Sequence, residues 1–432
     1  MKRIALIFSF NESNWVSCQK IVYNLHQSYQ LCQDIEIKKF NLPYETSPHF
    51  DMKDLVDEIL DFKPDVISII DHKPHPLPLL TQLSKAYSEK VRPELYIHLF
   101  GDFTLYFSAW SKLDAILTKF PVKFFVASDR QKIFIDNFLQ TEKSILCPFP
   151  VDTNEFQFNK NKRIEQRAAW GVSEEDKIFI YTGRLSRQKR IKSMIRTFSE
   201  TFETNANAKL FIYGHQDHVG DPFIGIQDMP GEYFRVFYRF YKSLPQDVQK
   251  RILFKGQVSS KELQGVYQGA DCLINLSVHN DEDFGMSVAE AQSTGMQSIL
   301  SSWAGLRSFN YSSDENFSLF CRTKIGDTSK LINIKDFKNH LTQVFNQQLI
   351  TDENRMARAE LSQSRFSIQS VGDIISQNLK IPASSFQGFS SIFQECATKH
   401  ANSNFEPMFL TPKRTINKLY KRIYSAYADE TT

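Results

Sequence analysis

The sequence predicts an α/β protein made of two Rossmann-like domains, each with a doubly wound parallel sheet. The chain has 432 residues, which is more than one hydrophobic core usually organises. Short apolar runs alternate with amphipathic helical patterns, which is the rhythm of a parallel sheet covered by helices on both faces. This rhythm ends near residue 150 and starts again near residue 178. We therefore expect two domains of the same class.

The composition narrows the class further. Hydrophobic residues make up 41% of the chain and charged residues 23%, values typical of a soluble globular protein. The formal net charge of +3 is too small to argue for nucleic-acid binding. The six cysteines are scattered without metal-binding spacing, which favours reduced thiols and a cytoplasmic protein. The apolar run at the start of the chain stops at Asn11-Glu12, so we interpret it as a buried strand rather than a signal peptide.

The first domain is expected to span residues 1–160, with a charged linker at 160–167. Apolar runs predict six strands, at residues 4–10, 35–42, 65–70, 95–101, 124–128 and 144–149. Helical spacing predicts three helices, at residues 51–62, 77–91 and 104–119. Six strands are enough for one sheet.

The second domain is expected to span residues 168–375. Strands are predicted at residues 178–183, 210–214, 251–256, 271–278 and 297–301. Helices are predicted at residues 191–202, 331–349 and 353–379. Six aromatic residues lie between positions 233 and 241. They fit either a helix packed into its own core or a surface for an acceptor or cofactor, and core packing is the commoner use of such spacing.

Residues 376–432 are expected to form a helical tail that packs back on the first domain. Within it, residues 413–424 combine an apolar stripe with five Lys or Arg residues. Such a basic amphipathic helix suits either peripheral contact with an anionic membrane surface or docking on the first domain with a solvated basic face. No run approaches 18 apolar residues, so no membrane-spanning segment is expected.

A basic loop follows the strand at 178–183. It reads Gly183-Arg-Leu-Ser-Arg-Gln-Lys-Arg190 and leads into a helix. Gly183 lets a ligand approach the backbone, and Arg184 and Lys189 place two cations at the end of the strand. Arginine grips phosphate oxygens in a bidentate manner and lysine adds a mobile charge, so the loop suits a diphosphate. The alternative is a solvated basic loop.

Two carboxylates follow the strand at 271–278. Glu282 lies in the loop and Glu290 about one turn into the next helix, with Phe284-Gly285 between them. Ligands of such units bind at the carboxyl ends of the strands, where a helix also offers free amides. Both glutamates are therefore expected to reach one ligand. The alternative is an exposed loop acid and a helix-surface acid. Fixed hydroxyl acceptors beside diphosphate-binding cations describe a nucleotide-sugar pocket.

These motifs together resemble the retaining GT-B glycosyltransferases of family four. The family's Gly-Arg-Leu-Ser-x-x-Lys-Gly loop is matched from Gly183 to Lys189, with Arg190 in place of the last glycine. Its Glu-x-Phe-Gly-x-x-x-x-Glu-Ala motif is matched from Glu282 to Ala291. The resemblance covers residues 140–310 well and implies the GT-B fold, with an acceptor domain followed by a donor domain.

The resemblance also implies roles for individual residues. Arg184 and Lys189 would bind the donor diphosphate, Glu282 the hydroxyls of the donor sugar, and Glu290 the ribose. The expected donor-binding set is Gly183, Arg184, Lys189, Phe284, Gly285, Met286, Ser287 and Glu290. The family often has a donor-sugar histidine after a first-domain strand, which makes His98 the fourth expected catalytic residue, with Glu282, Arg184 and Lys189. A histidine within a strand is also a common core residue.

Besides Arg190, the sequence departs from the family pattern in three places. Phe149-Pro150 stands where the family has Asn-Gly, and Ala304-Gly305 where it has Gly-Gly. The glycine-rich loop of the first domain is replaced by residues 11–17.

His72 and His75 form a further polar cluster after a first-domain strand. Asp281-Glu-Asp283 imitates a metal-binding Asp-x-Asp motif, but the two cations can neutralise a diphosphate, so neither a metal nor any other cofactor is expected.

The function expected from this resemblance is transfer of a sugar, most simply a hexose, from a UDP- or GDP-linked donor to a glycan, lipid or other hydroxyl acceptor. The donor is the expected partner; nucleic acid is not. The expected setting is polysaccharide biosynthesis in the cytoplasm, with contact at the inner face of the membrane through the basic helix. Two alternatives remain open: a GT-B sugar-nucleotide epimerase, and a non-catalytic GT-B scaffold.

Overall fold

The computed structural model contains two compact α/β units. It describes residues 1–10, 16–43, 51–87, 92–141, 143–348, 350–403 and 407–431. Unit 1 comprises residues 1–150 together with 366–405, and unit 2 comprises residues 151–365 together with 406–432. The first unit therefore ends ten residues before the expected boundary, and the expected tail is divided between the two units.

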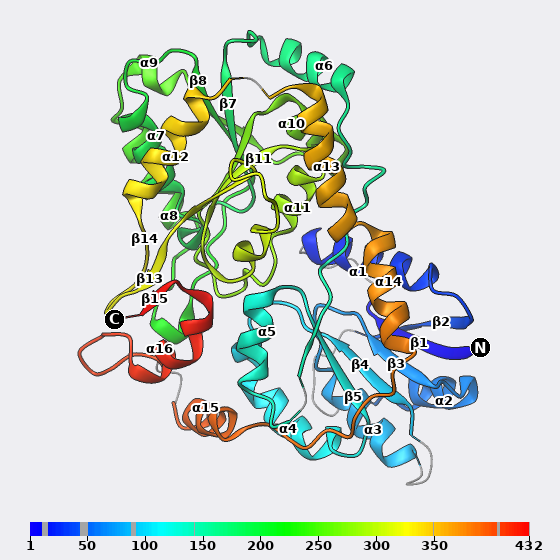
Figure 1. Ribbon diagram of the computed structural model, residues 1–432. Coiled ribbons are helices and arrows are strands. Elements are labelled where there is room, and N and C mark those ends of the chain that lie inside the picture. The colour runs from blue at the N-terminus through cyan, green and yellow to red at the C-terminus, as the bar shows by residue number, and fades with distance from the viewer. Residues whose placement is uncertain are drawn as a thin grey trace. The chain divides into compact units, whose positions relative to one another are not determined.

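Unit 1 is built on a six-stranded parallel sheet of order β2-β1-β3-β4-β5-β6 (Figure 1). Its strands are β1 (Lys2–Phe8), β2 (Ile35–Asn41), β3 (Val66–Ile69), β4 (Glu94–His98), β5 (Val122–Val126) and β6 (Ile145–Leu146). Its helices are α1 (Val16–Gln30), α2 (Lys53–Phe62), α3 (Leu77–Ala86), α4 (Phe107–Leu117), α5 (Asp129–Asp136), α14 (Ile368–Leu379) and α15 (Ser391–Ala401). The six predicted strands are confirmed, each within a few residues.

Unit 2 contains a second six-stranded parallel sheet, of order β12-β11-β10-β7-β8-β9. Its strands are β7 (Lys177–Thr182), β8 (Ala208–Tyr213), β9 (Ile252–Gly256), β10 (Cys272–Asn275), β11 (Gln297–Ser301) and β12 (Ser318–Cys321). Its helices are α6 (Lys160–Trp170), α7 (Ile191–Thr201), α8 (Glu232–Lys242), α9 (Gln246–Gln249), α10 (Ser260–Gly269), α11 (Met286–Gln292), α12 (Ile334–Asn346), α13 (Asp352–Phe366) and α16 (Lys418–Tyr424). A small sheet of order β14-β13-β15 joins β13 (Thr323–Ile325), β14 (Lys330–Ile332) and β15 (Glu430–Thr431).

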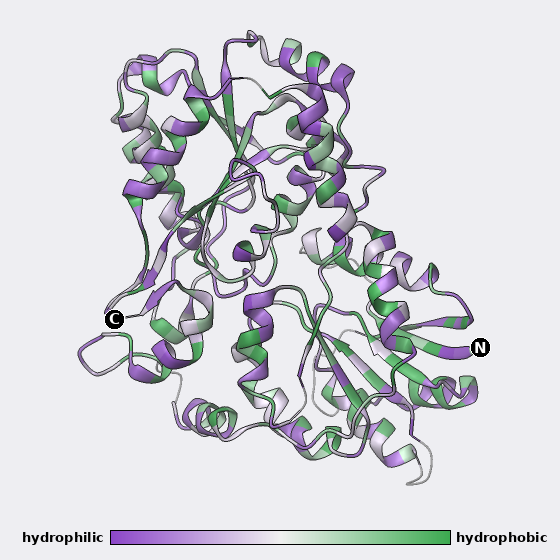
Figure 2. Cartoon of the chain, in the orientation of Figure 1, coloured by the Kyte–Doolittle hydropathy of each residue, from purple (hydrophilic) through white to green (hydrophobic). Residues whose placement is uncertain are grey.

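Burial on both faces explains why the central strands read as continuous apolar runs. Every residue of β7, β10 and β11 is buried. The helices beside them bury one stripe each; in α7 the side chains of Ile191, Ile195 and Phe198 are fully buried. Figure 2 shows this contrast, with hydrophobic strands inside and mixed faces on the surrounding helices.

The expected linker at residues 160–167 is wrong, because these residues begin helix α6. Asn159 caps the helix by accepting a hydrogen bond from the amide of Lys162, and Gly171 ends it in a left-handed conformation. The charges misled the sequence argument because Arg167 is only 2% exposed. Its guanidinium donates to the Gly269 carbonyl at 3.1 Å and also meets backbone oxygens beside β7, so α6 is fixed to unit 2.

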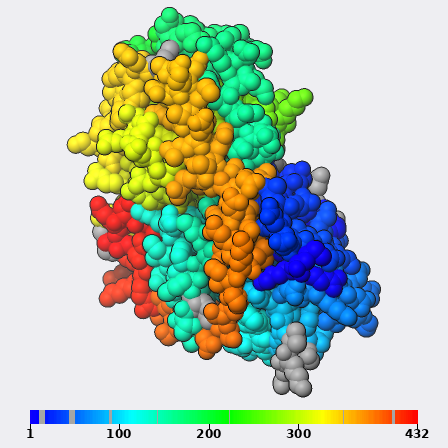
Figure 3. All heavy atoms as spheres, turned by 45° about the vertical axis from the view of Figure 1, so that its right-hand side comes forward, coloured from blue at the N-terminus to red at the C-terminus, as the bar shows by residue number. Residues whose placement is uncertain are grey.

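The expected helix at 353–379 is two helices. Ser367 interrupts it, because its side chain accepts a hydrogen bond from the amide of Ser370 and starts α14 as a new helix. α13 remains with unit 2, whereas α14 packs against α1 in unit 1. In Figure 3 the orange surface of α14 lies beside the blue surface of α1. The aromatic segment forms α8, and its buried Tyr233 and Phe237 confirm core packing.

The tail also differs from the expectation. Residues up to 405 belong to unit 1 as expected, but residues 406–432 return to unit 2. The apolar stripe of α16 is buried there: Tyr420 is fully buried and Ile423 is 1% exposed. This helix therefore has no free apolar face to rest on a lipid surface. Among the described residues, no helix is long and apolar enough to cross a membrane.

Candidate functional site

The order of the second sheet places two loops side by side at a switch point. From β7 the chain runs outward through β8 and β9, then returns to pair β10 with the other edge of β7. The loops after β7 and β10 therefore leave neighbouring strands and turn to opposite faces. In open α/β sheets this crevice at the carboxyl ends of the strands is where ligands bind. The basic loop follows β7 and the acidic loop follows β10, so the two sequence motifs meet.

Lys189 and Glu282 form an ion pair across this switch point. Glu282 is 8% exposed, and the Lys189 side chain is 15% exposed. Burial alone would raise the pKa of Glu282, but the Lys189 cation outweighs it and holds the pKa below its ordinary value of 4.5. The structure thus brings together Lys189, predicted to bind the diphosphate, and Glu282, predicted to bind the donor sugar. Their opposite charges are in contact.

Arg184 lies in the same loop and pairs with Asp217, which follows β8. The distance from Arg184 Nη1 to Asp217 Oδ2 is 2.5 Å. A third cation of the loop, Arg187, is held by Asp228 through two guanidinium nitrogens. Each of these cations is thus partly neutralised by a carboxylate. An anionic ligand that binds Arg184 or Lys189 must compete with these ion pairs.

Glu290 reaches the end of β7 from the opposite direction. It lies in α11, and its Oε2 is 3.5 Å from the hydroxyl of Tyr267. That hydroxyl is also 3.0 Å from the Oγ1 of Thr182, the final residue of β7. Glu282 is linked to the loop after β7 through its ion pair with Lys189. Glu290 is linked to Thr182, the final residue of β7, through Tyr267. Both glutamates are therefore buried and directed toward β7, unlike the exposed acids of the alternative interpretation.

Two glycines allow the acidic loop to fold tightly. Gly285 has φ +118°, a conformation that side chains rarely adopt. Gly305 follows β11, and a Cβ at this position would lie 2.3 Å from the backbone of Asp283. The Gly305 amide also donates to the Glu282 carbonyl at 2.8 Å. The loop after β11 therefore supports the backbone that carries Glu282.

His98 lies in the core of unit 1. It is 1% exposed, its Nε2 is 3.0 Å from the Tyr29 hydroxyl, and its ring stacks on Phe125. Burial lowers the pKa of His98 to about 3, so the imidazole is neutral. These contacts are those of a core histidine, and a role at the donor sugar stays a prediction.

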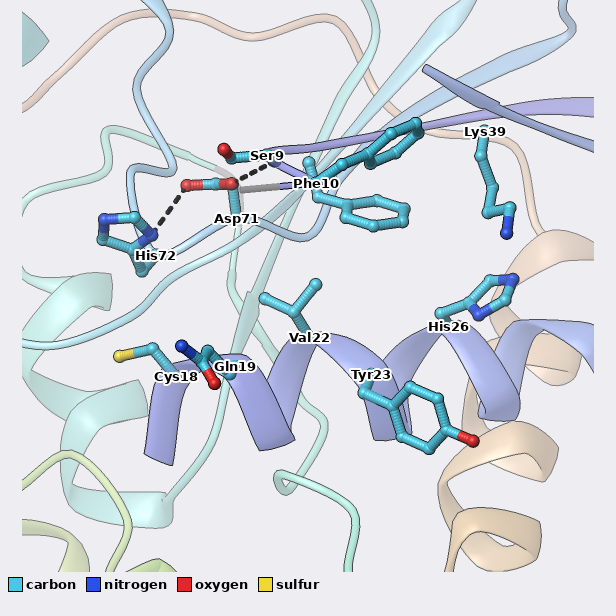
Figure 4. Close-up of a pocket in the computed structure, with 11 residues that line it drawn as sticks. Ser9, Phe10, Cys18, Gln19, Val22, Tyr23, His26, Lys39, Asp71 and His72 are labelled. Carbon is cyan, nitrogen blue, oxygen red and sulfur yellow. Dashed lines mark hydrogen bonds and ion pairs between the residues drawn. The ribbon is translucent and has the colours of Figure 1, made fainter. Parts of the chain in front are cut away.

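A pocket opens at the switch point of the first sheet. It has a volume of about 370 Å³ and is lined by residues that follow β1 and β3, by α1 and by Lys39. In Figure 4, Val22 and His26 of α1 face Phe10 across the pocket, and Asp71 and His72 lie at one end. Burial would raise the pKa of Asp71, but hydrogen bonds from His72 and from backbone amides lower it. The expected replacement loop, residues 11–17, lies almost wholly outside the described residues.

Of the second polar cluster, only His72 lines this pocket. His75 instead packs against Tyr106, with ring centroids 4.1 Å apart and the ring planes tilted by 37°. Burial lowers the pKa of His75 to about 4, so this ring is neutral at physiological pH. The two histidines predicted as one cluster therefore have different environments.

Several residues of the site were missed by the sequence argument. Asp217 and Tyr267 contact the predicted residues directly, and Lys330 joins both loops from β14. The signal for Asp217 was a polar run immediately after a strand. Lys330 carried no such signal, because it lies 40 residues beyond Glu290 in a short strand. Among the described residues, no group of three or more His, Cys, Asp or Glu side chains is arranged to hold a metal. Metal independence stays a prediction.

The segment of the chain that carries both loops is similar to known glycosyltransferases. Residues 162–317 match the family model for glycosyl transferases group 1. The matched segment contains the basic loop after β7 and the acidic loop after β10. An uncharacterized glycosyltransferase of Methanocaldococcus jannaschii, MJ1607, is 30% identical over 154 residues. That match covers 35% of this chain, and the chain spans about a third (34%) of the length of that relative.

Solved structures extend the similarity to the first unit. Anabaena Alr3699/HepE in complex with UDP has a TM-score of 0.63 at 14% identity, over 88% of this chain and 100% of that one. A glycosyltransferase from Rickettsia africae has a TM-score of 0.64 at 13% identity, over 91% and 98%. At these identities the likeness concerns the fold. The two parallel-sheet units match a GT-B fold, so the predicted fold class is confirmed.

The Lys189–Glu282 pair predicts a pH dependence of stability. The folded pKa of Glu282 lies below its unfolded value, so the pair stabilises the fold above about pH 4.5, and this contribution is lost as the pH falls through the folded pKa. The stability difference between wild type and Glu282→Gln should therefore be largest near neutral pH and shrink in acid. Urea unfolding at several pH values measures it.

Glu200→Gln, an exposed change on α7, serves as the control and should show no such trend. A wild-type advantage over Glu282→Gln that is the same at every pH contradicts the prediction.

Proposed function

We propose that this protein is a retaining glycosyltransferase that transfers a hexosyl group from a UDP- or GDP-linked sugar to a hydroxyl acceptor. The observation that carries the proposal is the meeting of Lys189 and Glu282 at the switch point of the second sheet, with Arg184 and Glu290 on the loops beside them. Cations and hydroxyl acceptors are the groups that a sugar linked to a diphosphate requires. The family of residues 162–317 supports the same chemistry.

In this proposal Lys189 and Arg184 bind the diphosphate. As the bond between the sugar and the diphosphate breaks, negative charge grows on the leaving phosphate, and cations already fixed beside it stabilise that charge. Their present partners, Glu282 and Asp217, keep them in place before the donor arrives. Amides of Phe284, Gly285, Met286 and Ser287 meet the donor from the other loop, and Gly183 leaves room beside the strand end.

Glu282 then accepts hydrogen bonds from hydroxyls of the donor sugar. Its lowered pKa keeps it ionised, which makes it a strong acceptor and a poor acid. Glu290 accepts the ribose hydroxyls. Catalysis is therefore positioning and electrostatic stabilisation, without a proton exchanged by either glutamate. This scheme assigns no role to a metal, because Lys189 and Arg184 are the groups that meet the charge of the diphosphate.

The pocket of unit 1 is proposed as the acceptor site. Its position at the carboxyl ends of β1 and β3, where the order of that sheet reverses, is where ligands of open α/β sheets bind. Valine and aromatic rings line most of it, with Asp71 and His72 at one end. We infer an acceptor with an apolar group beside its hydroxyl, as in a lipid-linked or otherwise substituted sugar.

Two alternatives from other classes make different predictions. A GT-B sugar-nucleotide epimerase consumes its substrate without any acceptor, and a non-catalytic scaffold binds no nucleoside diphosphate. The intact pairing of Lys189 with Glu282 favours an active donor site. Polysaccharide assembly in the cytoplasm remains the proposed setting, and contact with the membrane has lost the support of α16, whose apolar stripe is buried.

The two cations can be tested separately. Lys189→Met and Arg184→Met should each lower kcat/KM for the donor by about 10²–10³-fold, the usual cost of removing one group that stabilises transition-state charge. Transfer and hydrolysis of UDP- and GDP-sugars are followed by mass spectrometry. Arg196→Met on the exposed face of α7 is the matched control and should have no effect. Normal activity in both test variants would sink the assignment.

The two glutamates should differ in kind. Glu282→Gln is expected to lower kcat more than nucleotide affinity, because it loses an ionised acceptor at the sugar. Glu290→Gln is expected to weaken binding of the free nucleoside diphosphate, because it meets the ribose. Calorimetric titration with UDP and GDP, beside steady-state kinetics, separates the two effects. The opposite pattern means that the two roles are exchanged.

The acceptor pocket can be blocked from within. Val22 points into it, whereas Gln30 at the end of the same helix is exposed and does not line it. Val22→Trp should lower transfer to octyl β-glucoside by about 10²-fold, the cost of displacing reacting atoms by about 1 Å, and leave donor hydrolysis unchanged. Gln30→Trp adds a ring outside the pocket and is the control. Equal transfer by both variants places the acceptor elsewhere.

A further inference from the structure

A buried lysine outside the family match joins the two loops of the donor site. Lys330, in β14, is 1% exposed. Its Nζ donates to Asp221 Oδ2 at 2.5 Å, to Asn280 Oδ1 at 2.9 Å and to Gln188 Oε1 at 3.3 Å. An ammonium group has three hydrogens, and these three acceptors satisfy them. Asp221 balances its charge, so the cluster adds no net charge to the site.

Two of these acceptors are neighbours of the proposed catalytic residues. Gln188 directly precedes Lys189, and Asn280 lies two residues before Glu282. The loops are also joined by their backbones, because the amide of Val278 donates to the Gln188 carbonyl at 3.0 Å. Lys330 thus binds the basic loop next to Lys189 and the acidic loop close to Glu282. A shift of Lys330 would therefore change the distance between Lys189 and Glu282.

Arg190 adds a second attachment from the basic loop to β14. Its guanidinium donates to the backbone carbonyl of Lys330. Arg190 has φ +59°, in the left-handed region that glycine adopts without strain. This is the position at which the resembled family usually has glycine. The bond to Lys330 gives the arginine side chain a fixed place that a glycine would leave unused.

The C-terminal segment supports the same cluster. Tyr420 is fully buried, and its hydroxyl donates to Asn280 Oδ1 at 3.1 Å, the oxygen that also accepts from Lys330. β15 pairs with β13, and β13 pairs with β14, so residues 430–431 join the sheet that carries Lys330. Figure 1 shows α16 and β15 beside β13 in unit 2.

We propose that Lys330 and Tyr420 are positioning residues of the donor site, which hold Asn280 and Gln188 so that Glu282 and Lys189 meet the donor sugar and diphosphate in the reactive geometry. This inference rests on the proposed function. Neither residue touches the donor. Each acts through the loop residues it binds, and a displacement of about 1 Å at those loops is enough to cost about 10²-fold in rate.

The test separates positioning from folding. Lys330→Met alone leaves the Asp221 carboxylate buried without its cation and endangers the fold. Lys330→Met combined with Asp221→Asn removes both charges, and Tyr420→Phe removes a single hydroxyl. Lys421→Met is the matched control, because Lys421 lies on the same helix and pairs with Asp327 at the surface. All variants are measured at a temperature where circular dichroism shows them folded.

The double variant should lose about 10²-fold in kcat and Tyr420→Phe about three- to tenfold. The affinity for UDP or GDP should change less than threefold, because Arg184 and Glu290 are held by Asp217 and Tyr267, which lie outside the cluster. Lys421→Met should match wild type. A role confined to stability would leave kcat per folded molecule normal, and normal kcat in the double variant and Tyr420→Phe overturns the inference. Wild type that binds no nucleoside diphosphate and turns over no sugar nucleotide refutes the proposed function instead.

Discussion

The proposed donor site depends on one ion pair, which the order of the strands in the second sheet makes possible. Lys189 and Glu282 are 93 positions apart and meet because β10 returns to the free edge of β7. If β10 did not pair with β7, the two loops would leave strands that are not neighbours. Burial makes the pair consequential, since a carboxylate with little access to water is ionised only where a cation compensates its desolvation. The sheet supplies the proximity and the pair supplies the electrostatics, so neither motif has its proposed chemistry alone.

The sequence was most informative where local pattern and burial agree. Strands β7, β10 and β11 are buried on both faces and therefore carry uninterrupted apolar runs, and the amphipathic α7 has its stripe where the spacing placed it. The two loops were found because glycine, cations and carboxylates stand directly after such strands. The roles of these loop residues toward a substrate were inferred from the family resemblance. The arrangement of the two loops is compatible with those roles.

The sequence was least informative where tertiary contacts override local character. Arg167 made α6 look like a solvated linker, yet it is buried among carbonyl oxygens that no local pattern announces. Lys330 and Tyr420 escaped notice for the same reason, because their partners lie between 50 and 142 residues away in the sequence. Ala304 and Arg190 stand at positions where the resembled family has glycine, and both have positive φ. At both positions the backbone keeps a positive φ, although glycine, the residue that adopts this conformation most easily, is absent.

The return of residues 406–432 to unit 2 has a consequence for how the protein is made. Unit 2 is interrupted by residues 366–405, which belong to unit 1. A ribosome therefore completes every strand of both large sheets before Tyr420 has been synthesised. During that interval Asn280 lacks one of its two partners, and β13 has only β14 beside it. A nascent chain therefore has the residues of both large sheets before it has Tyr420, the second partner of Asn280 beside the proposed donor loops.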